Sequence, residues 1–292
     1  MDTTTAKALI ELNNRFYAQH AASFSATRSA PWHGWEQLVE VLHEHGWGNP
    51  QTAGAARVLD MACGNLRFEH FLAGAFPSID FDFHAVDSCP ALMASHADLP
   101  AACAFHQCDV LAALIEGVDG IPEVPLCDLS VSFGFMHHIP DARLRSDALS
   151  ELVAHTAPNG LIVVSFWQFM NDERLAKKAA RTDETLRVQC SHAAGAPGAG
   201  LNPDGTQRQS SSEDTPAMPA ASTVDISQLD EHDHFLGWQS DPSPLRYCHH
   251  FGEAEIDELV ASVGTAVREV TRYSADGASG TLNRYLVLER LS

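Results

Sequence analysis

Three aspartates stand where short apolar runs end and a helical pattern begins. Asp60 lies in RVLDMACGNLRF (57–68), Asp87 ends FHAVD, and Asp109 ends FHQCD. In a doubly wound sheet the carboxyl ends of neighbouring strands meet at one edge, where ligands bind. A carboxylate offers several acceptor sites, so Asp87 could accept from both ribose hydroxyls and Asp109 from an adenine amino group. Together the acids predict an adenosyl site, although Asp87 or Asp109 alone could merely cap the next helix.

The turn after Asp60 contains small residues, and a turn without bulk lets the backbone approach a ligand closely. The predicted cofactor-binding residues are Asp60, Ala62, Cys63, Gly64, Asp87, Ser88, Asp109 and Val110. NAD is the alternative ligand for a sheet of this kind, but the G-x-G-x-x-G pattern is absent. A single glycine is too few to place a pyrophosphate on a helix start.

Two adjacent histidines, His137 and His138, follow the fourth predicted strand. They could act as a base, as hydrogen-bond donors or as a wall of the substrate pocket; the alternative is that one caps the next helix and the other packs. We predict no metal site, because adjacent side chains point apart and no third ligand stands nearby. The HDH run at 232–234 is a weak metal motif.

Strand-like and helical patterns alternate along the chain, which is typical of a parallel sheet covered by helices on both faces. Two further strand-like runs joined by SADGASGTL predict an antiparallel hairpin. The fold class is α/β, with a single doubly wound, mostly parallel seven-stranded sheet and a C-terminal antiparallel hairpin. The predicted strands are 57–61, 81–87, 104–109, 127–133, 160–169, 266–273 and 283–290, and the predicted helices are 67–76, 90–97, 109–117, 141–155 and 253–263.

The predicted organisation is one domain with an insertion. An N-terminal helical cap segment (1–50) precedes a Rossmann-like core (51–181). Residues 182–234 are rich in Ala, Gly, Pro, Ser and Asp without apolar periodicity, which favours a disordered insertion. Residues 235–292 complete the same domain with a substrate segment, a helix and the closing hairpin.

Composition restricts the function classes. The chain has 292 residues and a net charge of -20, from 18 basic and 38 acidic residues, which lowers the expectation of broad nucleic-acid binding. Seven cysteines without a C-x-x-C pair favour reduced thiols over disulfides or a zinc ribbon. No secretion signal or membrane-length apolar run is visible. We therefore expect a cytoplasmic protein that does not bind membranes.

Residues 55–170 and the closing hairpin resemble the class I methyltransferases that use S-adenosylmethionine (SAM), whose first motif reads D-x-G-x-G-x-G. The resemblance implies SAM as cofactor, with Asp60 to Gly64 at its methionine end, Asp87 at the ribose and Asp109 at the adenine. Two positions depart from the motif, because Ala62 and Leu66 stand where glycine is usual. The Leu66 side chain must point away from the cofactor or narrow the pocket.

Three segments resemble the eukaryotic tRNA wobble-uridine carboxymethyl methyltransferases, which esterify a carboxymethyl group on uridine. They are residues 13–32, 164–169 and 245–251. Arg246, Tyr247, His249 and Phe251 match the family's R-Y-Y-H-x-F segment, and Cys248 replaces its second tyrosine. The resemblance implies tRNA modification, with a small activating partner protein that could supply the missing basic surface.

A carboxylate acceptor would need no general base, since it is ionised at neutral pH. Methyl transfer then depends on holding the oxygen, methyl carbon and sulfur in line. A guanidinium fork fixes both carboxylate oxygens, so Arg28 and Arg246 are candidates for gripping the substrate, unless they form structural ion pairs. Tyr247, His249 and Trp167 could shape the pocket or stack on a base, although core packing is the alternative for Trp167 and Trp32.

Two other functions remain open from the sequence. A small-molecule methyltransferase would suit the acidic balance, and a hydroxyl or amine acceptor would require His137, His138 or His249 as a base. A non-catalytic SAM-binding regulator is the third possibility, raised by Leu66 in the altered turn. The six candidate catalytic residues are Arg28, His137, His138, Arg246, Tyr247 and His249.

Overall fold

A seven-stranded sheet of order β3-β2-β1-β4-β5-β9-β8 forms the centre of the protein. The computed structural model describes the chain except residues 29, 50–53, 96–101, 196–223, 239–240 and 292. Strands β1 to β5 are parallel, and β9 is antiparallel to both β5 and β8, which confirms the predicted fold class. The strands are β1 (Ala55–Met61), β2 (Asp80–Asp87), β3 (Cys103–Gln107), β4 (Cys127–Ser132), β5 (Thr156–Trp167), β8 (Val267–Ala275) and β9 (Asn283–Arg290).

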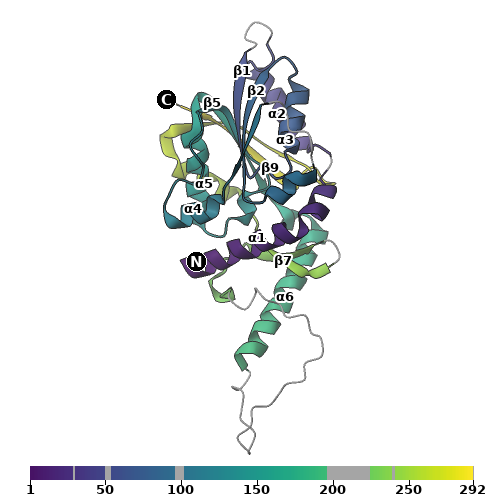
Figure 1. Ribbon diagram of the computed structural model, residues 1–292. Helices are drawn as coiled ribbons and strands as arrows, with labels where there is room; N and C mark the ends of the chain where they lie inside the picture. Colours follow the sequence, from purple (N-terminus) through teal and green to yellow (C-terminus); the bar gives the residue numbers. More distant parts are fainter. Residues whose placement is uncertain (29, 50–53, 96–101, 196–223, 239–240, 292) are drawn as a thin grey trace, which may run out of the picture.

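Helices cover both faces of this sheet (Figure 1). Successive residues of a strand point to opposite faces, so Val58 packs with α2 (His33–Glu44) and α3 (Arg67–Ala75). Its neighbour Leu59 packs with α4 (Val110–Glu116), α5 (Ala142–His155) and α7 (Glu253–Ser262) on the other side. Burial on both faces explains why these strands read as continuous apolar runs.

The chain reverses direction across the sheet at β1, which pairs with β2 on one side and β4 on the other. This is the switch point of a doubly wound sheet, where connections leave in opposite directions and open a crevice at the carboxyl ends of the strands. The predicted helix at 90–97 begins as a short 3₁₀ helix, η1 (Pro90–Ser95), and its last two residues lie outside the described residues.

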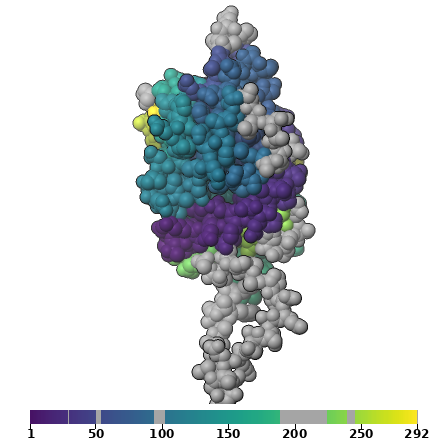
Figure 2. Space-filling view, in the orientation of Figure 1, coloured from purple at the N-terminus to yellow at the C-terminus, as the bar shows by residue number. Residues whose placement is uncertain are grey.

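A second layer closes the carboxyl end of the sheet. Helix α1 (Thr3–Ala26) runs across it, with the hairpin of β6 (Asp233–Trp238) and β7 (Asp241–His249) beyond (Figures 1 and 2). Leu9 and Leu12 of α1 pack on Phe235 and Tyr247 of this hairpin. The N-terminal helix α1 therefore covers the crevice at the switch point.

The first part of the predicted disordered insertion, residues 182–195, is helical. Helix α6 (Glu173–Gly195) extends through residues 182–195, and β6 begins at residue 233. Asp183 anchors this helix, because its carboxylate accepts from the backbone N–H of Phe235 (2.9 Å) and contacts His234 Nδ1 (2.8 Å). Residues 196–223 of the predicted insertion lie outside the described residues. No described helix is long and apolar enough to cross a membrane.

Candidate cofactor and substrate site

A cavity of about 500 Å³ lies at the carboxyl ends of β1, β2 and β4, beneath α1. Its size is that of a small-molecule or cofactor pocket. All eight predicted cofactor-binding residues line it, together with four of the six predicted catalytic residues, Arg28, His137, His138 and Arg246. The tertiary structure thus brings together segments from residue 10 to residue 283 in a single pocket.

The turn after β1 keeps the backbone shape of a glycine-rich loop although only one glycine remains. Ala62 (φ 68°), Gly64 (φ 60°) and Leu66 (φ 59°) all adopt the left-handed conformation. This conformation costs a residue with a Cβ roughly 1–2 kcal/mol. A Cβ added at Gly64 would meet no atom within 4 Å, so the backbone there faces open space in the cavity.

Leu66 points away from the cavity. Its side chain is 0% exposed and packs against Cys63 and Ala85, with Met93 and Phe105 beside them. Full burial of a leucine contributes about 2–3 kcal/mol, which offsets the cost of its left-handed backbone. Leu66 therefore supports the turn from behind and leaves the cavity open.

Asp87 fixes the turn and faces the cavity. One carboxylate oxygen accepts from the backbone N–H of Gly64 (2.9 Å), and the other accepts from that of Cys89 (2.7 Å). Burial raises the pKa of Asp87 above its usual range, although these backbone donors oppose the effect. Since each carboxylate oxygen has two lone pairs, acceptor sites remain for the hydroxyl groups of a ligand.

Asp109 both caps a helix and lines the cavity. Its Oδ1 accepts from the backbone N–H of Ala112 in α4 (3.0 Å), and its Oδ2 accepts from the Asn14 side chain on α1 (2.6 Å). The capping role and the ligand-facing role, which the sequence left as alternatives, are compatible. The carboxylates of Asp60, Asp87 and Asp109 thus border one cavity from three neighbouring strands.

Among the basic residues that line the cavity, Arg28 and Arg246 have no acidic partner in the described chain. Arg246 is 8% exposed, and its guanidinium lies 5.4–5.6 Å from the ring centres of Phe16, Trp167 and Trp238. Its Nε is buried without a hydrogen-bond partner. Among the described residues, no ion pair involves Arg246 or Arg28. Burial and then the nearby Arg246 lower the pKa of Arg28.

The two adjacent histidines are buried beside Arg246. The Tyr17 hydroxyl lies 2.7 Å from His138 Nε2, and His138 Nδ1 lies 3.0 Å from the carbonyl of Tyr247 and 3.2 Å from the amide nitrogen of Asn13. Both ring nitrogens of His138 therefore have hydrogen-bond partners. Burial, followed by the charge of Arg246, lowers the pKa of His138 to about 3. Burial also lowers the pKa of His137 well below its usual range.

His137, His138 and Cys248 form a compact cluster, with one potential ligand atom from each within 4.8 Å of the others. A metal needs a free imidazole nitrogen and a thiolate. Both nitrogens of His138 are already engaged, and burial raises the pKa of the Cys248 thiol to about 12. In this arrangement only His137 and Cys248 keep a ligand atom that is not already engaged by a hydrogen-bond partner of the described chain.

Tyr247 and His249 do not line the cavity. Alternate residues of a strand face opposite sides, so Arg246 faces the cavity while its β7 neighbours at 247 and 249 point behind the strand. There, His249 lies between two carboxylates, with Nδ1 2.7 Å from Asp233 and Nε2 2.9 Å from Glu255. The Tyr247 hydroxyl also donates to Asp233 (2.5 Å). These two residues hold the Arg246 strand in place from its far side.

His249 is a buried imidazolium in this network. Burial alone would lower its pKa, but the hydrogen bonds that the ring donates to Asp233 and Glu255 raise it overall. The same contacts lower the pKa of both carboxyl groups in spite of their burial. A raised histidine pKa stabilises the fold below the ordinary value and loses that effect as pH rises through the folded value.

Replacing His249 with glutamine is expected to lower the free energy of unfolding by about 3 kcal/mol near pH 6, because it leaves the buried Asp233 carboxylate without its cation, while Glu255 keeps its ion pair with Arg145. The difference from the unaltered chain should shrink towards pH 9, as His249 loses its proton. Urea unfolding from pH 5.5 to 9 measures this. His155→Gln, at a partly exposed ion pair on α5, is the matched control. A pH-independent difference would contradict the charged state of His249.

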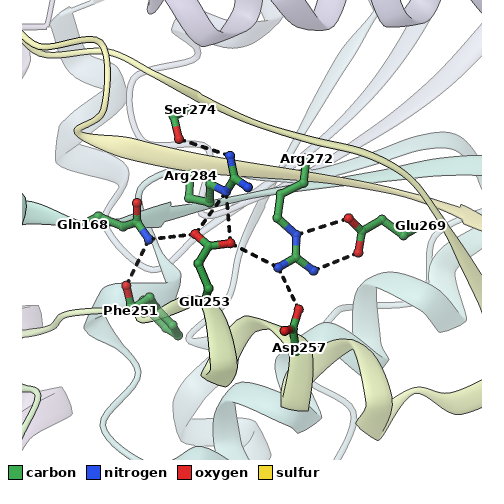
Figure 3. A network of polar contacts seen from close by, with 8 residues as sticks. All are labelled: Gln168, Phe251, Glu253, Asp257, Glu269, Arg272, Ser274 and Arg284. Atoms are coloured by element: carbon green, nitrogen blue, oxygen red, sulfur yellow. Dashed lines mark hydrogen bonds and ion pairs between the residues drawn. The ribbon is translucent and has the colours of Figure 1, made fainter.

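A second polar network lies at the surface between α7, β8 and β9 (Figure 3). Glu253 at the start of α7 contacts Arg272 (3.3 Å), Arg284 (3.1 Å) and the Gln168 side chain (3.2 Å). Gln168 also donates to the carbonyl of Phe251 (3.2 Å). Since Gln168 directly follows β5, this network ties the end of the strand that carries Trp167 to the chain that leaves β7.

Several cavity residues escaped the sequence analysis. Asn13, Asn14 and Tyr17 come from α1, and Arg67 comes from the start of α3. The four-residue spacing of Asn13 and Tyr17, which places both on one helix face, was the available signal. Nothing in the sequence indicated that α1 would lie across the switch point, because that depends on its packing with the β6–β7 hairpin.

Solved structures share this fold. A SAM-dependent methyltransferase from Clostridium acetobutylicum ATCC 824 has a TM-score of 0.52 at 11% identity, covering 96% of this chain and 99% of that one. One from Methanosarcina mazei scores 0.50 at 13% identity, over 81% and 93% of the two chains. The N-methyltransferase NodS from Bradyrhizobium japonicum WM9, in complex with S-adenosylhomocysteine, scores 0.50 at 12% identity, over 99% and 100%. The chain therefore has the fold of SAM-dependent methyltransferases.

One curated relative has a similar sequence. It is the tRNA (carboxymethyluridine(34)-5-O)-methyltransferase ALKBH8 of Mus musculus, 26% identical over 174 residues. The match takes in 56% of this chain and 22% of that protein, so the chain spans about a fifth of the relative's length. No protein-family model matches the chain.

Proposed function

We propose that this chain is a SAM-dependent methyltransferase that esterifies a carboxylate. The observation that carries the proposal is the state of Arg246, a buried guanidinium that lines the cavity without an acidic partner. A buried charge is costly unless it is paired. An anionic substrate would supply the missing partner, and a carboxylate matches the guanidinium fork.

The described residues of the cavity fit the cofactor. Its acidic part, bordered by Asp60, Asp87 and Asp109, suits a ligand with an ammonium group, ribose hydroxyls and an adenine amino group. The empty space over Gly64 allows the ligand to approach the backbone. SAM, when bound, supplies an electrophilic methyl group on a sulfonium sulfur.

The residues around the acceptor would act by positioning it. Arg28 and Arg246 orient the carboxylate, and the rings of Trp167 and His137, which pack against each other at 4.8 Å, form a wall of the pocket beside it. An ionised carboxylate carries its own nucleophilic electron pair, so no proton must be removed. His138 then has no catalytic proton to accept, in keeping with its two occupied ring nitrogens.

A carboxymethyl group on a tRNA uridine is the proposed acceptor, supported by the likeness to ALKBH8 and by the aromatic rings around Arg246. The net charge of -20 opposes direct tRNA binding by this chain. A small basic partner protein that completes the tRNA surface would resolve this opposition, and it is part of the proposal. A small carboxylic acid is the second candidate acceptor, favoured by the same charge.

Incubation with methyl-labelled SAM should place the label in a methyl ester, with tRNA carrying carboxymethyluridine as one substrate and a set of small carboxylic acids as the other. Mild alkali should release the label, because esters hydrolyse where methyl ethers and methylamines do not. At saturating SAM, kcat should stay within about twofold between pH 6 and 8, since the acceptor is ionised throughout. Replacing His137 or His138 with glutamine should leave that flat profile unchanged.

Alkali-stable label, or a kcat that rises with pH and loses that rise in a histidine variant, would contradict carboxylate transfer and indicate a hydroxyl or amine acceptor. Binding of SAM without transfer to either substrate set, in the presence of a basic partner, would favour the non-catalytic regulator. Tight binding of tRNA by the chain alone would remove the need for a partner.

A further inference from the structure

Two carboxyl groups lie in contact beneath the turn after β1. Asp60 lines the cavity at the end of β1, and Glu69 stands behind it in the first turn of α3. The two side chains are neighbours, close enough for the charge of Glu69 to act on Asp60. Asp60 is 3% exposed and Glu69 is 0% exposed, so water does not separate or screen them. Glu69 was not among the residues that the sequence indicated.

No described group neutralises this pair. The titratable groups that face it are Asp87 from β2 and the thiols of Cys63 and Cys103, and none of them is a cation. Asp60 Oδ1 and both Glu69 oxygens are buried without a hydrogen-bond partner in the described chain. A buried carboxylate that lacks a donor or a cation is costly when ionised, so two such neighbours favour a proton on one of them.

The electrostatic surroundings favour that proton. Burial raises the pKa of Glu69 to about 8, although its own backbone N–H and the Asp60 side chain oppose the shift. Burial, followed by the charges of Glu69 and Asp87, raises the pKa of Asp60 well above its usual range. A cationic group placed against Asp60 would reverse this balance, because an opposite charge favours the ionised carboxylate.

We propose that Asp60 and Glu69 share a proton in the ligand-free site and that the α-ammonium group of the cofactor displaces it. This inference rests on the proposed function. The ammonium contacts Asp60, the carboxyl pair ionises, and the released proton passes to the solvent. Glu69 is a positioning residue, since it reaches the ligand through Asp60. Cofactor affinity then decreases as the pH is lowered, by up to about tenfold for each pH unit below the pKa of the pair.

Calorimetry of S-adenosylhomocysteine binding at pH 7, in phosphate and in Tris, counts the protons released. We expect between half a proton and one proton for each ligand bound. 5′-Methylthioadenosine has the same adenosyl and thioether groups but no ammonium. Its binding should therefore release fewer than about 0.2 protons. This comparison needs no variant, and it separates the pair at residues 60 and 69 from Asp87, which faces the ribose of both ligands.

Glu69→Gln should abolish the proton release, because its amide donates to Asp60 and keeps that carboxylate ionised. The dissociation constant for S-adenosylhomocysteine should then vary less than about twofold between pH 6 and 7.5, where the unaltered chain varies about tenfold or more. Glu69→Leu removes the shared proton with a residue of similar volume. Glu151→Gln on α5, remote from the cavity, is the matched control and should retain the release.

Equal proton release with both ligands, or release that persists in Glu69→Gln and Glu69→Leu, would overturn the inference and leave the proposed function intact. Failure of the unaltered chain to bind either ligand would instead overturn the proposed cofactor, and this inference with it.

Discussion

Replacement of Arg246 with leucine is expected to lower kcat/KM for carboxylate methylation by about 10²–10³-fold, while the dissociation constant for S-adenosylhomocysteine changes less than threefold. Truncating one partner of a buried, hydrogen-bonded charge pair costs about 2–5 kcal/mol. The guanidinium is enclosed by three aromatic rings, so no water replaces its contact with the substrate. The acids that face the cofactor lie elsewhere in the cavity and keep their own partners.

The controls for this prediction separate charge from packing. Arg246→Lys keeps the charge but loses the planar fork, and we expect an intermediate loss. Arg143→Leu on α5, at a side chain 66% exposed, should leave kcat/KM unchanged. A neutral carbamoylmethyl analogue of the acceptor should inhibit the unaltered chain more weakly than the carboxylic acid does. With Arg246→Leu, the neutral analogue and the acid should inhibit equally. Full activity of Arg246→Leu would remove the main support for a carboxylate acceptor.

Replacement of Asp87 with asparagine is expected to weaken S-adenosylhomocysteine binding by about 100-fold. The carboxylate is placed to accept from two ribose hydroxyls, and hydrogen bonds to a charged group are worth about 1.5–3 kcal/mol each. The amide has one acceptor oxygen in place of two and presents N–H groups to hydroxyl donors. It can still accept from the backbone N–H of Gly64 or Cys89, so the turn is expected to remain folded. Calorimetry measures the affinity, and thermal unfolding verifies the fold.

Asp82→Asn is the matched control, since Asp82 lies on the same strand with a side chain 48% exposed. Its affinity for the ligand should equal that of the unaltered chain. Retention of tight binding in Asp87→Asn would place the ribose elsewhere and contradict the assignment of the adenosyl site. If Asp87→Asn loses both binding and the folded state, the measurement would be repeated with Asp87→Glu, which keeps both acceptor oxygens.

The cavity is lined by both acidic and basic side chains. Asp60, Asp87 and Asp109 are among its acids, and Arg28 and Arg246 are among its bases. The acids suit a cationic cofactor and the guanidinium groups an anionic acceptor, which is what the proposed function requires.

The sequence by itself determined the fold and the edge of the sheet where the cavity lies. Strand ends are a local property, because an apolar run must stop where the chain turns, and Asp60, Asp87 and Asp109 stand at three such ends. Parallel strands bring their carboxyl ends together without further information. The low-complexity composition could not show that α6 extends to residue 195, since its anchor at Asp183 is a contact with a strand about 50 residues away.

The tertiary structure alone decided which side chains share the cavity. Arg246, Tyr247 and His249 match one sequence segment, but the match did not show that only Arg246 faces the cavity. The face that each side chain of a strand occupies depends on what packs behind the strand. In the same way, Leu66 turns inward because it packs into a hydrophobic cluster, and Glu69 lies near Asp60 because α3 packs behind the turn. These are contacts between distant elements, and their free energies depend on burial that no local pattern encodes.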